Sequence, residues 1–296
     1  MNESPCDLCG SRSARELYTA RDRLGNSTAD FHISQCLKCG ILRTLPPMTE
    51  RELARFYPAD YWGDEQPSLD WIRSSQKEKT RFFDGCHLAG GRILDVGCGA
   101  GFFLRALDPQ NWNRYGVEIS REAALLAARA LGDDRVFAGV LKEAQYENSF
   151  FDAVSFWSAL EHANEPRASL VEAHRILKTG GTLILQVPNA ASYQARVFRG
   201  HWFALDAPRH RYHFTRKILD QLLRETGFEI YRATFFSKAH NAHALRQSLK
   251  SKLRADQPSS FGRAMFLLSL PFLRPVDWLM SAARQGATIT LAARAV

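Results

Sequence analysis

The chain has 296 residues, 45% of them hydrophobic and 24% charged, which is the composition of a globular protein with one large core and a small accessory module. No apolar run approaches the ~20 residues of a membrane span, and the opening residues lack the basic and apolar regions of a secretory signal, so we expect a cytoplasmic protein. The formal net charge of +8 leaves nucleic acid, acidic substrates and anionic lipid open as partners.

Four of the six cysteines stand in two CxxC pairs, "CDLCG" and "CLKCG". Each pair places two thiolates on one tight turn, and two such turns supply the four soft ligands of a tetrahedral Zn²⁺ site. In a chain with no export signal, this pattern indicates metal rather than disulfides. We therefore predict a structural zinc ion that stabilises a module of residues 1–45, which is too small to fold alone. The predicted ligands are Cys6, Cys9, Cys36 and Cys39.

Residues 46–90 connect this module to the rest of the chain. The stretch "FYPADYWGDE" places aromatic rings, among them Tyr61 and Trp62, in a short loop. A helix follows, with Pro67 near its start and Gly90 past its end. Two interpretations of the aromatic loop stay open: packing against the main domain, or a flap over a ligand. We treat 46–90 as a helical and aromatic lid segment.

From Gly91 onward, short apolar runs alternate with helical patterns. This alternation predicts an α/β fold with a doubly wound parallel sheet, and places a ligand at the carboxyl ends of the strands. The predicted strands are 92–97, 114–119, 135–139, 151–157 and 181–188. The predicted helices are 101–108, 120–132 and 166–180.

The turn after the first of these strands, "DVGCGAG", is typical of nucleotide-binding sites, and its neighbours narrow the choice of ligand. It lacks the lysine of a P-loop, and Phe102 stands where a dinucleotide fingerprint needs its third glycine. Asp95 would repel a pyrophosphate but suits a ligand with ammonium and sulfonium charges. Glu118 ends the next strand, where an acidic residue accepts hydrogen bonds from ribose hydroxyls. The combined pattern indicates S-adenosylmethionine.

Four stretches, "LDVGCGAG", "YGVEIS", "FDAVSFWSALEHANEP" and "RILKTGGTLILQVPN", resemble the class I S-adenosylmethionine-dependent methyltransferases over roughly residues 90–236. The resemblance implies a Rossmann-like sheet of seven strands in a domain of residues 91–296, with its last two strands at 228–236 and 287–295. It places Val140 and Leu141 at the adenine and Trp157 beside the methionine portion. The implied cofactor-binding residues are Asp95, Gly97, Cys98, Gly99, Gly101, Glu118, Ile119, Val140, Leu141 and Trp157.

A hydroxyl acceptor of the methyl group needs a base, and the sequence offers two places for one. The first is Glu161 and His162, after the fourth predicted strand. Some relatives bind a divalent metal there through ExxEH, but Ser158 replaces the first glutamate, so we predict no metal at this position. The alternative for His162 is a packed or capping histidine.

The second place is "HWFALDAPRHRYHFT", residues 201–215, at the edge of the sheet where members of the family bind acceptors. His210 and His213 are the leading candidates for a base, and they share one face only if this turn is helical. The alternative is a solvated loop fixed by its aromatic residues.

Residues 237–286 form an insertion where the family needs only a turn. Eight basic residues against Asp256 and Asp277 give the insertion six of the chain's eight net charges, and 264–273 is a run of ten uncharged residues. One interpretation is a helical hairpin that buries this run on its own domain. The other is peripheral contact with anionic membrane at the inner membrane surface, or with a lipid-linked acceptor.

The leading hypothesis is a small-molecule methyltransferase that acts on an oxygen of a sugar, glycoconjugate or natural-product intermediate. One alternative is an rRNA or tRNA methyltransferase with a zinc finger. The zinc and the charge favour it, but the chain lacks an [ND]PP[YF] motif after the fourth strand and has no cysteine after Cys98. A second alternative is a non-catalytic scaffold that binds the cofactor.

Overall fold

The computed structural model describes residues 5–25, 27–49, 52–53, 55–57, 67–237, 240–255, 275 and 278–296. The chain divides into two compact units, each assembled from segments far apart in the sequence. The first unit comprises Met1–Pro58, Val187–Leu219 and Thr234–Ile289. The second comprises Ala59–Gln186, Asp220–Ala233 and Thr290–Val296.

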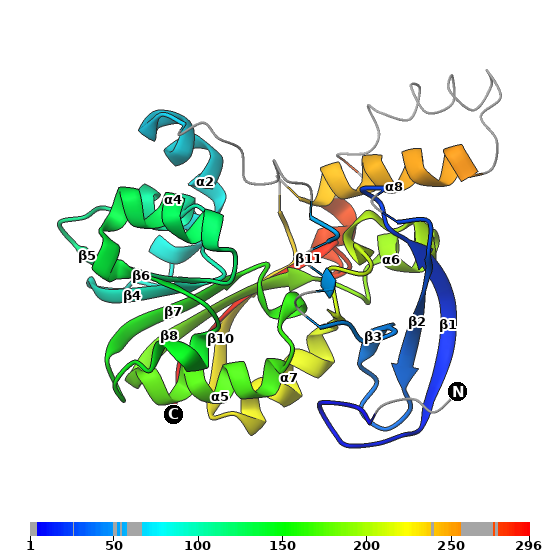
Figure 1. Cartoon of the computed structure of the whole chain (residues 1–296), viewed down its shortest axis with the longest axis horizontal. Helices are drawn as coiled ribbons and strands as arrows, with labels where there is room; N and C mark the ends of the chain where they lie inside the picture. Colours follow the sequence, from blue (N-terminus) through cyan, green and yellow to red (C-terminus); the bar gives the residue numbers. More distant parts are fainter. Residues whose placement is uncertain are drawn as a thin grey trace. The chain divides into compact units, whose positions relative to one another are not determined.

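The second unit is built on a sheet whose described strands follow the order β10-β11-β8-β7-β4-β5-β6 (Figure 1). The strands are β4 (Gly91–Val96), β5 (Trp112–Glu118), β6 (Val136–Ala138), β7 (Phe151–Trp157), β8 (Leu177–Pro188), β10 (Phe228–Thr234) and β11 (Thr288–Ala295). Strand β4 is parallel to β5 and β7, β5 is parallel to β6, and β7 is parallel to β8. The predicted Rossmann-like sheet of seven strands is thus confirmed.

The helices of this unit begin at the residues that the sequence indicates. Helices α2 (Leu69–Asp84) and α4 (Arg121–Leu131) lie on one face of the sheet and α5 (Pro166–Ile176) on the other, as Figure 1 shows. The hydroxyls of Ser68 and Ser120 accept hydrogen bonds from the first turns of α2 and α4. The short helix α3 (Phe102–Ala106) follows the glycine turn directly and packs against α2.

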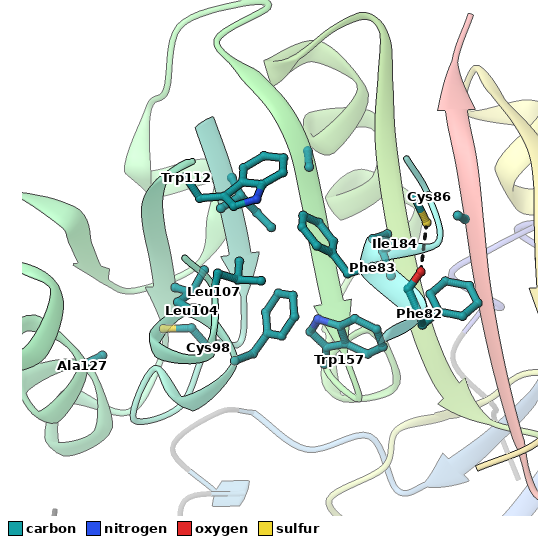
Figure 2. Close-up of a cluster of buried hydrophobic side chains, with 14 residues drawn as sticks. Phe82, Phe83, Cys86, Cys98, Leu104, Leu107, Trp112, Ala127, Trp157 and Ile184 are labelled. Atoms are coloured by element: carbon teal, nitrogen blue, oxygen red, sulfur yellow. Dashed lines mark hydrogen bonds between the residues drawn. The ribbon is translucent and has the colours of Figure 1, made fainter. Parts of the chain in front are cut away.

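The core beside the glycine turn is aromatic (Figure 2). Phe83 of α2 packs edge-to-face against Phe103 and Trp112, with ring centroids 5.8 and 5.0 Å apart. Phe103 packs in turn against Trp157 at the end of β7, at 5.2 Å. These contacts fix the carboxyl end of β7, the start of β5 and the short helix α3.

The first unit contains a second sheet, of described strand order β1-β2-β3-β9. Strands β1 (Ala14–Arg21), β2 (Asp30–Cys36) and β3 (Leu42–Leu45) form an antiparallel meander, drawn in blue in Figure 1, and β9 (Tyr212–His213) pairs antiparallel with β3. No sequence pattern predicts β9. A shared core of Phe31, Ile33, Trp202 and Leu205 packs this meander against the segment that follows β8.

Helices α6 (Tyr193–Phe198) and α8 (Asn241–Ala255) also belong to this unit, and α7 (Arg216–Glu225) begins in it. Helix α8 contacts α6 and the 3₁₀-helix η5 (Phe203–Leu205), and the Ser248 hydroxyl accepts from the backbone N–H of Phe203 at 2.8 Å. The apolar run 264–273 and the aromatic pair Tyr61 and Trp62 lie outside the described residues. Among the helices that the structure describes, none is long and apolar enough to cross a lipid bilayer.

Candidate active site

The glycine turn brings bare backbone to the carboxyl end of β4. Gly97, Gly99 and Gly101 have φ values of +73°, +54° and +75°, a region that favours glycine. A Cβ on Gly97 would lie 2.7 Å from the Cβ of Ala159, closer than such atoms approach. The backbone N–H of Gly97 donates to the carbonyl of Val117 at 2.8 Å, which fixes the turn beside β5. Side chains are therefore excluded here, and a ligand can approach the peptide groups.

Glu118 closes the carboxyl end of β5 and is buried. Its Oε2 accepts from the backbone N–H of Gly99 at 2.8 Å and its Oε1 accepts from that of Ser120 at 2.9 Å. Burial raises the pKa of Glu118, and these backbone donors oppose the rise. Each carboxylate oxygen has a further lone pair, so the group can still accept from a pair of hydroxyls.

Asp95, near the end of β4, is 2% exposed and accepts a hydrogen bond from the hydroxyl of Ser155 at 2.7 Å. Burial raises the pKa of Asp95 to about 7, although the charge of Lys79 and the Ser155 hydrogen bond act in the opposite direction. A buried carboxyl with this pKa favours a cationic ligand group, because the ligand charge stabilises the ionised form.

Lys79 on α2 is the neighbouring cation that sequence reasoning missed. Its ammonium lies 5.5 Å from the centre of the Trp157 ring, and burial lowers the pKa of Lys79 against the opposing charge of Asp95. A lysine on a surface-patterned helix carries no motif. Only the packing of Phe82 and Phe83 on α2 against the sheet brings it to this place (Figure 2).

Trp157 ends β7 and is almost fully buried between Phe82 and Phe103. Its indole N–H has no hydrogen-bond partner among the residues that the structure describes. A buried donor without a partner costs free energy of about 1–3 kcal/mol, so this N–H is suited to a polar atom of a bound molecule.

Two exposed apolar side chains follow the ends of β5 and β6. Ile119 is 52% exposed and Val140 is 36% exposed, and the backbone N–H of Gly139 donates to the Glu118 carbonyl at 2.9 Å, which joins their segments. Leu141, the next residue, is buried. The Cys98 thiol belongs to the hydrophobic core and leaves only its backbone for a ligand. An apolar pair beside a carboxylate fits a flat ring attached to a sugar.

These features fit S-adenosylmethionine, group by group. Asp95 and the Trp157 region suit the charged amino-acid end, Glu118 suits the ribose hydroxyls, and Ile119 with Val140 suits the adenine. The glycine turn presents backbone peptide groups rather than side chains to the chain that links them.

The structure places the predicted base candidates in different units. His162 lies half-buried in the 3₁₀-helix η3 (Leu160–His162) of the second unit. His210 and His213 lie in the first unit, where 212–213 form strand β9 and not a helical turn. Nδ1 of His210 lies 2.9 Å from the carbonyl of Ala204, and its Nε2 lies 3.7 Å from Oδ2 of Asp206.

Asp206 belongs to a buried ion network. Its Oδ1 accepts hydrogen bonds from Nη2 of Arg209, at 2.6 Å, and from the guanidinium of Arg23. Arg209 is 1% exposed and also donates a hydrogen bond to Asp22 at 2.8 Å. Burial alone would raise the pKa of Asp206, but His210, Arg209 and Arg23 hold it below its usual range. Asp206 therefore stays ionised, with Oδ1 bound by arginines and Oδ2 directed at His210.

The cysteines of the two CxxC pairs converge in the first unit. Their Sγ atoms all lie within 4.8 Å of one another, with Cys6 to Cys39 at 3.6 Å and Cys9 to Cys36 at 3.5 Å. Both turns close in the same way, because Gly10 and Gly40 donate their backbone N–H to the carbonyls of Cys6 and Cys36. The cysteine cluster thus joins the start of β1 to the end of β2.

The chain is similar to known methyltransferases in sequence and in fold. A family model described as a methyltransferase domain matches residues 70–233, more than half of the chain. A ubiquinone biosynthesis O-methyltransferase of Pseudomonas aeruginosa is 26% identical over 196 residues, which cover 60% of this chain and 83% of that protein. An uncharacterised protein of Methanocaldococcus jannaschii is 39% identical over 101 residues, covering 34% of this chain and 38% of that one.

The fold matches the crystal structure of an S-adenosylmethionine-dependent methyltransferase from Mesorhizobium loti with a TM-score of 0.50 at 19% identity, covering 77% of this chain and all of that one. The segment 70–233 that the family model matches contains the glycine turn, Asp95, Glu118 and Trp157. The chain therefore belongs to the methyltransferase domain family, and it is an S-adenosylmethionine-dependent methyltransferase.

Proposed function

We propose that the protein methylates a hydroxyl group of a small molecule, and that His210 accepts the hydroxyl proton. S-adenosylmethionine supplies an electrophilic methyl group with a good leaving group, so positioning of the acceptor does most of the remaining work. The acceptor oxygen gains the methyl carbon, and its proton moves to Nε2 of His210. This proposal rests on the pairing of His210 with the ionised carboxylate of Asp206.

The hydrogen bonds of His210 favour this role. Its Nδ1 lies at hydrogen-bond distance from the Ala204 carbonyl, which only accepts, so Nδ1 carries a hydrogen and Nε2 of the neutral ring holds the lone pair. A proton taken up at Nε2 then lies near Oδ2 of Asp206, whose charge stabilises the imidazolium.

Relatives named ubiquinone biosynthesis O-methyltransferase support oxygen as the methylated atom. We extend the acceptor class to phenols and to the hydroxyls of sugars and glycoconjugates.

We further propose that the cysteine cluster binds a structural zinc ion. Tetrahedral ligation at a Zn–S distance of about 2.3 Å separates the sulfur atoms by about 3.8 Å. The separations of 3.5 and 3.6 Å, and the limit of 4.8 Å for the whole cluster, fit this geometry. Four protein ligands leave no position for water, so the ion stabilises the fold and takes no part in methyl transfer.

The decisive experiment measures S-adenosylhomocysteine release with a panel of phenols, monosaccharides and nucleotide-linked sugars, and with tRNA and rRNA in a parallel arm. We expect turnover with a hydroxyl compound and a product that carries an O-methyl group. An N-methyl or C-methyl product, or methyl transfer only to RNA, would overturn the proposal.

For cofactor binding, we expect Glu118→Ala to weaken S-adenosylhomocysteine binding by about 1–3 kcal/mol, through lost hydrogen bonds to the ribose. Isothermal titration calorimetry measures this change. Glu122→Ala is the matched control. Glu122 is an exposed glutamate two residues after Ser120, and its carboxylate accepts a hydrogen bond from the Ser120 hydroxyl. Equal affinity in Glu118→Ala and Glu122→Ala would remove Glu118 from the site.

The pKa of Asp95 predicts how cofactor binding depends on pH. The ammonium group of S-adenosylhomocysteine binds the ionised carboxyl, and with a pKa of about 7 that form is lost as the pH falls below neutrality. Affinity should therefore be level above pH 7 and fall about tenfold per pH unit below it, with proton release on binding. Asp95→Asn should bind weakly with no such slope. A wild-type affinity that is constant from pH 5.5 to 8 would contradict this role.

A further inference from the structure

Strand β3 of the cysteine-containing segment reaches directly into the segment of His210 and His213. Leu42 pairs with His213 and Arg43 pairs with Tyr212 in the antiparallel ladder of β3 and β9. The backbone N–H of Thr44 continues the ladder by donating to the carbonyl of Arg211 at 3.0 Å. The two segments are more than 160 residues apart in sequence.

The side chain of Thr44 makes two further contacts, both buried. Its Oγ1 lies 2.6 Å from the carbonyl oxygen of His210 and 3.0 Å from Nε2 of His213. A carbonyl only accepts, so the single proton of the Thr44 hydroxyl is used on His210. Toward His213 the hydroxyl oxygen can then only accept, and Nε2 must carry a hydrogen.

This assignment fixes the state of the His213 ring. His213 is 2% exposed, and burial lowers its pKa to about 3 against the opposing charge of Asp206, so the ring is neutral and carries one hydrogen. With that hydrogen on Nε2, Nδ1 holds a lone pair. Nδ1 is buried and has no hydrogen-bond partner among the described residues.

We infer that Thr44 is a positioning residue for methyl transfer: it fixes His213 as an Nε2–H donor, so that Nε2 of His213 cannot take up a proton, and it holds the backbone of His210 in place for the role of base. The role of His210 in this inference rests on the proposed function. The tautomer of His213 follows from the hydrogen-bond geometry alone. The N-terminal segment thereby supplies part of the framework for the acceptor site.

The ring state can be measured on the whole protein without any acceptor. Nitrogen-15 NMR of histidine-labelled protein distinguishes the tautomers, and we expect His213 to show a protonated Nε2 and an unprotonated Nδ1 from pH 5 to 8. In Thr44→Val, which keeps the shape and removes the hydroxyl, the Nε2–H signature should be lost. Thr44→Ser should retain it. A wild-type ring protonated on Nδ1, or one that titrates in this range, would overturn the inference.

Kinetics test the positioning role with the acceptor that the panel identifies. Thr44→Val should lower kcat about 10- to 100-fold while S-adenosylhomocysteine affinity is unchanged, because a displaced base costs rate and not cofactor binding. Thr44→Ser should be close to wild type. A kcat for Thr44→Val equal to that of the wild type would overturn the positioning role and leave the proposed function standing.

A second pair of variants covers the case in which Thr44→Val fails to fold. The side-chain amide introduced by His213→Gln reaches the position of Nε2 and can donate to Thr44 in its place. The shorter amide introduced by His213→Asn reaches only the position of Nδ1, so this hydrogen bond is lost. We expect activity in the first variant and a large loss in the second. The reverse order would show that Nδ1, and not Nε2–H, is the essential atom. If no hydroxyl compound is methylated by the wild type, the proposed function fails, and the NMR result still decides the state of His213.

Discussion

His210→Asn should lower methyl transfer by about 10²- to 10⁴-fold, the usual contribution of a positioned general base, and leave S-adenosylhomocysteine affinity unchanged. Asparagine places an amide donor where Nδ1 of the histidine bonds the Ala204 carbonyl, so the local fold is retained. It removes Nε2, the atom that faces Asp206. The measurement is single-turnover transfer to the identified acceptor, with calorimetry for the cofactor.

His201→Asn is the matched control, because His201 lies in the same segment and bonds the hydroxyl of Ser251 on the surface. Its rate should be close to that of the wild type. An acceptor supplied already deprotonated, at a pH above the pKa of its hydroxyl, should recover much of the rate in His210→Asn. Equal rates in His210→Asn and the wild type at neutral pH would show that another group, or solvent, takes the proton.

The cofactor side of the candidate site follows from local sequence patterns. Asp95, the three glycines and Glu118 each stand at the end of a run that alternation marks as a parallel strand. Because such strands end at one edge of a sheet, their positions in sequence fix their proximity in space. The caps at Ser68 and Ser120 are equally local, since a hydroxyl at the first position of a helix bonds within one turn.

The acceptor side could not be predicted in this way. Arg209 is held by Asp22, almost 190 residues away in sequence, and β9 forms only because β3 offers an open edge to it. Neither contact has a local signature. Strand β9 consists of two residues, too few to show the alternation of apolar and polar residues that predicts a strand. An arginine next to a proline, as at Arg209, suggests a solvated loop. Tertiary context turned that loop into a buried network.

The largest structural effect is expected in Cys6→Ser/Cys9→Ser. Structural zinc contributes about 10–16 kcal/mol to the folding free energy of isolated zinc-finger peptides. A small module that loses a contribution of this size should no longer fold. The variant should contain no zinc by elemental analysis, and β1 to β3 should lose protection from hydrogen exchange. S-adenosylhomocysteine should still bind, because Asp95, Glu118 and Trp157 belong to the second unit.

Acceptor turnover should nevertheless be lost in this variant. When β3 unfolds, Thr44 no longer contacts His210 and His213. The buried ion pair between Arg209 and Asp22 is also broken, at a cost of about 3–5 kcal/mol. Cys86→Ala is the control, since Cys86 is a buried cysteine of the second unit outside the cluster, and it should keep both zinc and turnover. A wild-type protein that is free of metal, with four reactive thiols and an ordered N-terminal sheet, would show that packing alone folds this segment.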